Sequence, residues 1–188
     1  MIIKGMEYFK ITDDIEYPNR WYLGDINVSD MWQFSIGKPV DEKKLKNLKV
    51  KFDEKGESMD FTLNDGEGVP IISQLFAECL REFMDDIQLL PLKVPGISEK
   101  YYIMVIKNAI ECVDENLSVF EKFEVGNDIR PDLAGDYQDI EVLKVDTSRI
   151  NRHIFRIAKY EVAAIVSGEV KDRLGVAKVT GIEFELVS

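Results

Sequence analysis

The stretch ISQLFAECLREFMDDI, residues 72–87, carries the most regular pattern in the sequence. Its apolar side chains recur at intervals of three and four, the spacing that lines up one face of a helix. Ser73 is well suited to cap the first turn, because its hydroxyl can accept a hydrogen bond from a free backbone N–H. The pattern predicts an amphipathic helix at about 73–87 that packs on a sheet through Leu75, Phe76, Cys79, Leu80, Phe83 and Met84.

The segments around this helix predict strands. Tyr101–Ile106 is a run of β-branched and aromatic residues without alternation, which is typical of a strand buried on both faces. Ser167–Gly175 predicts a short helix with Ser167 as its N-cap. Two helices cannot cover both faces of a parallel sheet. We therefore expect an α+β fold, a mainly antiparallel sheet packed by one long amphipathic helix (about 73–87) and a short C-terminal helix.

Length and composition indicate a globular protein. A chain of 188 residues with 45% apolar and 31% charged residues can bury a sizeable core. We expect a single domain over 1–188, or an N-terminal lobe 1–67 followed by a second lobe 68–188. The apolar runs are far shorter than the roughly 20 residues of a membrane-spanning helix, and the first residues lack the pattern of a secretion signal. Cys79 and Cys112 have no metal-site or redox spacing, so a cytoplasmic protein is expected.

Negative charge is concentrated in the middle of the chain. The net charge is −11, and residues 101–148 alone carry 11 acidic and 4 basic side chains. Binding to nucleic acid is not expected, because phosphate contacts need a positive surface. An acidic surface keeps a protein soluble, and it also attracts a basic partner and speeds their association.

The sequence contains no recognisable catalytic or cofactor motif. His153 is the single histidine. Together with Cys79 and Cys112 it makes only three candidate ligands for a metal site of the usual His/Cys kind, and they have no short spacing. Neither a phosphate-binding glycine loop nor a calcium loop is present. We expect no catalytic residues, no metal and no cofactor, hence a binding protein that is not an enzyme. The alternatives are a small-ligand or regulatory binding domain, and an acid/base hydrolase that would use carboxylates and His153.

Three groups of segments, in this order and spacing, resemble one family. The first is Gly68–Ser73 followed by the helix and Gln88–Leu92. The second is Tyr101–Ile106 followed by Val113-Asp114 and Ser118. The third comprises Ile154–Arg156, Ala164–Ser167, the short helix and Gly181–Phe184. Together they resemble family eleven of the immunity proteins from bacterial polymorphic-toxin systems, over about residues 68–187.

This resemblance implies a cytoplasmic protein that binds and neutralises a cognate toxin by occlusion. The acidic stretch then becomes the candidate interface, since binding residues often lie on loops and an acidic face would attract a basic toxin. The expected contact residues are Asp128, Asp132, Asp136, Asp139 and Glu141. The sequence leaves the oligomeric state open.

Overall fold

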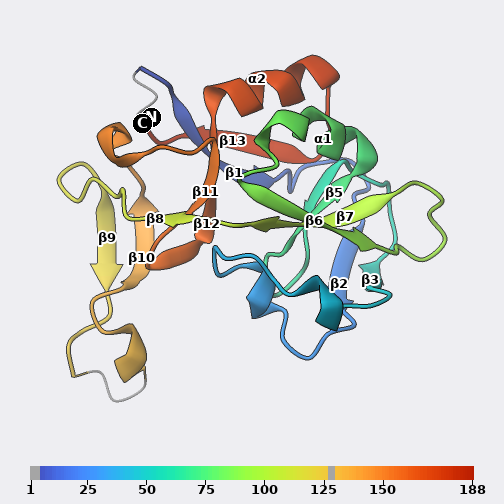
Figure 1. The fold of residues 1–188 in the computed structure, drawn as a ribbon, viewed down its shortest axis with the longest axis horizontal. Coiled ribbons are helices and arrows are strands. Elements are labelled where there is room, and N and C mark those ends of the chain that lie inside the picture. The colour runs from blue at the N-terminus through green and yellow to red at the C-terminus, as the bar shows by residue number, and fades with distance from the viewer. Residues whose placement is uncertain (1–4, 127–129) are drawn as a thin grey trace.

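The computed structural model of the chain describes residues 5–126 and 130–188 (Figure 1). Strands make up 39% of the protein and helical residues 17%. In the described residues, two larger sheets lie against each other, and two short α-helices pack where the sheets meet. The α+β expectation is therefore wrong, and the protein is mostly β.

The larger sheet has five strands in the order β13-β1-β12-β11-β8. Its pairs are antiparallel, except that β8 runs parallel to β11. The first strand of the chain lies between two strands from the last thirty residues. The bounds are β1 (Tyr8–Asp13), β8 (Ala109–Ile110), β11 (Ile154–Ile157), β12 (Tyr160–Ser167) and β13 (Ile182–Leu186).

The second sheet has four antiparallel strands in the order β4-β5-β7-β6. Two further antiparallel pairs, β2 with β3 and β9 with β10, lie outside both sheets. The bounds are β2 (Tyr22–Ile26), β3 (Val50–Glu54), β4 (Phe61–Leu63), β5 (Pro70–Ser73), β6 (Ile87–Leu92), β7 (Tyr101–Ile106), β9 (Val119–Lys122) and β10 (Tyr137–Val142).

Both sheets are covered on both faces, which produces three apolar clusters. The first cluster lies between the sheets and the helices, the second lies under the N-terminal third, and the third lies under residues 112–150. The strand predicted at Tyr101–Ile106 is confirmed. Met104 and Ile106 point into the first cluster, while Ile103 and Val105 point into the second, which explains why the sequence of this strand does not alternate.

The helix predicted at about 73–87 is much shorter than expected. The observed helix α1 spans Gln74–Cys79, a 3₁₀ turn η3 follows at Arg81–Phe83, and Ile87 already begins β6. Phe76, Leu80 and Phe83 are buried as predicted, but Leu75 and Met84 are each 40% exposed. The apolar spacing in the sequence thus continues through an α-helix, a 3₁₀ turn and the start of a strand.

A contact with a distant part of the chain prevents the helix from continuing to residue 87. The carboxylate of Asp86 is buried, and its Oδ2 accepts hydrogen bonds from the backbone N–H groups of His153 (2.9 Å) and Ile154 (3.1 Å). Asp86 is thereby fixed beside β11, and Ile87 pairs with Ile106 of β7. A continuing helix could not satisfy either contact.

The short C-terminal helix is present as α2 (Gly168–Ala177), and Ser167 caps it by accepting a hydrogen bond from the N–H of Val170. It ends at Lys178, whose φ of 56° is left-handed. None of the helices described is long and apolar enough to cross a membrane. The remaining 3₁₀ turns are η1 (Trp32–Phe34), η2 (Glu42–Lys44), η4 (Pro131–Leu133) and η5 (Thr147–Arg149).

Candidate functional site

The acidic stretch of the sequence forms a hairpin that projects from one side of the molecule. Strands β9 and β10 lie at the edge of the view in Figure 1, with η4 in the connection beyond them. Ile140 anchors the hairpin because its side chain is buried in the third apolar cluster, where Phe120 and Tyr137 also pack. The opposite face of the hairpin is left to solvent.

On the solvent-exposed face of the hairpin, residues of the same kind lie opposite each other on the two strands. Glu121 of β9 lies opposite Asp139 of β10, and Val119 lies opposite Val142, and all four residues are exposed. Two carboxylates that face each other across a strand pair repel and destabilise it. The hairpin therefore carries a charge arrangement that its own stability does not favour.

The structure places four of the five predicted contact residues on or beyond this hairpin. Asp132 lies in η4 and accepts two hydrogen bonds from Arg130, at 3.0 Å from Nε and 2.9 Å from Nη2, which lower the pKa of its carboxyl. Asp136 is half-buried where the hairpin closes, and Asp139 and Glu141 are exposed on β10. Asp128 lies outside the described residues.

A groove of about 740 Å³ runs between the outer end of the hairpin, the start of β12 and η1. Asp132 and Asp136 lie on it, whereas Asp139 and Glu141 do not. Aromatic and aliphatic side chains make up much of its wall, namely Trp32, Phe123, Leu133, Tyr137, Tyr160 and Val162. The predicted residues are therefore divided between the groove and the open strand face.

Basic side chains near the hairpin are held by carboxylates of the same protein. Lys122 Nζ is 2.6 Å from Glu115 Oε1, which also accepts a hydrogen bond from the Tyr137 hydroxyl at 2.7 Å. The contacts with Lys122 and then Tyr137 lower the pKa of Glu115. Lys159 Nζ lies 3.1 Å from Glu111. These cations are thus already paired within the protein.

The sequence analysis missed the groove residues that come from outside the acidic stretch. Trp32 belongs to η1 and is 43% exposed, and Val162 of β12 is 61% exposed. Tyr160 lies beside them, with its pKa raised mainly by burial. A tryptophan between Asp30 and Gln33, in a turn-rich segment, is a local signal of a surface aromatic, but nothing in the sequence places it beside residues 130–137.

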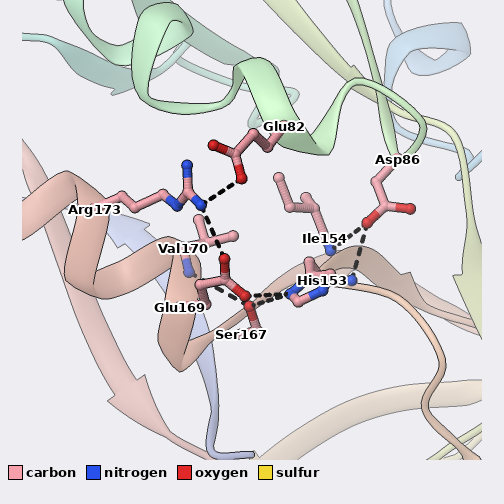
Figure 2. A network of polar contacts seen from close by, with 8 residues as sticks. All are labelled: Glu82, Asp86, His153, Ile154, Ser167, Glu169, Val170 and Arg173. Carbon is pink, nitrogen blue, oxygen red and sulfur yellow. Dashed lines mark hydrogen bonds and ion pairs between the residues drawn. The ribbon is translucent and has the colours of Figure 1, made fainter. Parts of the chain in front are cut away.

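His153 belongs to a separate polar network, shown in Figure 2. Its Nδ1 lies 2.9 Å from Ser167 Oγ and 3.9 Å from Glu169. Arg173 continues the network, since its Nη2 lies 2.6 Å from Glu82 and 3.0 Å from Glu169. The network joins η3 to α2 and to the start of β11.

The geometry of this network suits packing better than catalysis. Ser167 is fully buried, and its Oγ already accepts the N–H of Val170 as a helix cap. Asp86 binds backbone N–H groups and not the imidazole ring, so Asp86, His153 and Ser167 do not form the relay that orients a catalytic histidine. Among residues 5–126 and 130–188, no group of three or more acidic, histidine or cysteine side chains is arranged to hold a metal ion.

Comparison with known proteins relates the chain to one family. A search of curated proteins finds no relative. The model of the Immunity protein family (Imm11) matches residues 89–188, which include the hairpin, β11, β12, α2 and β13. Because the match covers more than half of the chain and agrees with the resemblance found in the sequence, the protein belongs to the Immunity protein family (Imm11).

Proposed function

We propose that the protein is a cytoplasmic antitoxin that binds a cognate bacterial toxin and blocks it by occlusion, without chemistry of its own. Family membership is the observation that carries this proposal. The arrangement of the only histidine supports the non-catalytic part, because its nearest hydroxyl is a buried helix cap.

The projecting hairpin is the proposed toxin-binding surface. Asp136, Asp139 and Glu141 offer carboxylates there, together with Asp132, and Asp128 lies in the same segment of the sequence. The opposed pair Glu121 and Asp139 supports this assignment, since a basic partner would relieve the repulsion between the two carboxylates. The net charge of −11 favours a basic toxin for the same reason.

Protection of cells tests the function directly. The toxin gene adjacent to this gene would be expressed in a host with and without the protein, and survival would be counted. We expect survival only when the protein is present, and a stable complex when the two purified proteins are mixed. Failure of the protein both to protect cells and to bind the neighbouring toxin would contradict the proposal.

Charge reversal tests the hairpin as the binding surface. The double variant Asp139→Lys, Glu141→Lys, on the exposed face of β10, should slow association with the toxin more than it speeds dissociation, because charges at an interface rim act mainly on encounter. Raising the salt concentration should slow the unmodified protein in the same way, since the Debye length falls from about 10 Å at 0.1 M to about 3 Å at 1 M. Stopped-flow mixing at two ionic strengths measures both effects.

A matched control separates local charge from total charge. Asp172 on α2 and Glu183 on β13 are exposed and lie on other elements, so the double variant Asp172→Lys, Glu183→Lys changes the net charge equally. We expect it to associate much faster than the hairpin variant. Equal association rates for the two variants would remove the hairpin from the interface and leave the antitoxin function standing.

A further inference from the structure

The groove beside the hairpin combines aromatic rings with carboxylates. Trp32 and Tyr160 lie on its walls with Asp136 and Glu161. The two cations on the same walls already have acidic partners, because Arg130 is bound by both carboxylate oxygens of Asp132 and Lys159 pairs with Glu111. The Asp136 carboxylate, by contrast, has no hydrogen-bond or ion-pair partner among the described residues.

This combination favours a cationic ligand. A guanidinium or ammonium group is attracted to the face of an aromatic ring, and most strongly to tryptophan. Carboxylates beside the ring add a charge-assisted hydrogen bond. Arginine suits such a site better than lysine, because its planar guanidinium can stack on a ring and donate to a carboxylate at once. A second copy of this chain fits poorly, since both copies carry a net charge of −11.

We propose that this groove is the receptacle for an arginine side chain of the basic toxin, stacked on Trp32 and hydrogen-bonded to Asp136. The inference rests on the proposed antitoxin function and adds the chemistry of one anchor contact. The groove would bury part of the arginine between the hairpin and η1, which is the situation in which single side chains contribute strongly to binding.

The groove depends on the folded protein, because its two sides come from distant parts of the chain. Trp32 lies outside the residues that match the family, while the hairpin and β12 lie inside them. The backbone N–H of Tyr137 donates to the carbonyl of Lys159 at 3.2 Å, which fixes the hairpin to the turn before β12. An isolated peptide of the hairpin should therefore not reproduce the site.

The two tryptophans of the chain allow a test without the toxin. Trp21 is fully buried and Trp32 is exposed, so protein labelled with 5-fluorotryptophan gives an internal reference and a reporter by ¹⁹F NMR. Titration with N-acetyl-arginine amide should shift the Trp32 resonance and leave that of Trp21 in place. The uncharged N-acetyl-citrulline amide should not shift it, and Asp136→Asn should weaken the response to arginine. Equal shifts with both compounds, or none with arginine, would overturn the proposal.

Binding to the toxin gives the second test. Trp32→Leu keeps an apolar side chain but removes the ring, and it should weaken the complex by about 5- to 30-fold, the loss of one cation–π contact. Trp32→Phe should restore much of the affinity. Val176→Ala changes an exposed apolar residue on α2 and should leave the affinity unchanged. Circular dichroism and thermal unfolding verify that each variant is folded.

The outcomes separate this inference from the function on which it rests. If the unmodified protein binds the toxin and Trp32→Leu binds equally well, the arginine receptacle is wrong and the antitoxin function stands. If the unmodified protein does not bind the neighbouring toxin, the function fails, and the arginine titration still decides whether the groove binds a guanidinium. A dimer in solution that Trp32→Leu dissociates would also overturn the proposal, because the groove would then bind a second copy.

Discussion

Arg156 is a fully buried cation in the five-stranded sheet. Its Nη1 donates to the carbonyl of Glu161 at 2.6 Å, but its Nε and Nη2 have no hydrogen-bond partner among the described residues. Burial lowers the pKa of the guanidinium to about 10. A base whose pKa falls on folding destabilises the folded state at every pH below that value, because the charged form is the one penalised.

Replacing Arg156 with methionine should therefore stabilise the protein. We expect Arg156→Met to raise the free energy of unfolding by about 1–3 kcal/mol at neutral pH, since an apolar side chain of similar length removes an unpaired buried charge. The advantage over the unmodified protein should shrink as the pH rises through about 10. Urea unfolding measures both, with the exposed Arg149→Met as a control that should change stability by less than about 0.5 kcal/mol. A clear loss of stability in Arg156→Met would contradict this account.

The two cysteines should differ sharply in reactivity. Cys112 is fully buried, and burial raises the pKa of its thiol to about 12, so almost no thiolate forms at neutral pH. Cys79 is half-buried, and its pKa is raised chiefly by burial. A thiol reagent at pH 8 should modify Cys79 slowly in the folded protein and Cys112 only after unfolding. Mass spectrometry locates the adducts, Cys79→Ser should abolish the native reaction, and early labelling of Cys112 would refute the assignment.

At the scale of elements, α1 and η3 can be distinguished from a continuous helix by mutation. Phe83 is 5% exposed, whereas Leu75 and Met84 are each 40% exposed. Phe83→Ala should cost about 3–5 kcal/mol of unfolding free energy, as for other buried aromatic residues. Leu75→Ala and Met84→Ala should each cost much less, because both side chains already contact water. Comparable losses in all three variants would favour the long amphipathic helix over the observed break.

This region also shows what the sequence could and could not predict about the fold. The spacing identified Phe76, Leu80 and Phe83 as core residues, because side-chain burial at intervals of three and four follows from any backbone that turns at about that rate. The entry into β6 in place of a longer helix depends on Asp86, whose hydrogen bonds reach residues 67 and 68 positions further along the chain. The spacing of apolar residues within one segment cannot predict a hydrogen bond to a residue so far along the chain.

For the whole molecule, the same limit applies to the candidate site. Charge density located the hairpin, since a cluster of acidic residues is visible in the sequence itself. The groove could not be anticipated, because Trp32 and Tyr160 are brought to the hairpin only by the packing of η1 and β12. The residue types support the proposal of a basic partner, whereas the shape of the groove follows only from the tertiary structure.

The protein should unfold as one unit. We propose a single domain and not two separable lobes, because β1 lies between β13 and β12 in the larger sheet. Calorimetric and van't Hoff enthalpies of unfolding should agree, and a fragment of residues 68–188 should lack a cooperative transition. Adding a peptide of residues 5–67, which contains β1, should restore the cooperative transition of the fragment. An independently folded 68–188 fragment would contradict the proposal.

The position of β1 also affects how the protein matures during synthesis. Lys10 pairs with Glu185, a partner made 175 residues later, so a growing chain holds this apolar strand without its neighbours until translation is nearly finished. Pairing over such distances slows folding and leaves strand edges open to wrong partners. On the function proposed above, the protein would give no protection while it is on the ribosome, and a cell would need a stock of finished molecules before the toxin arrives.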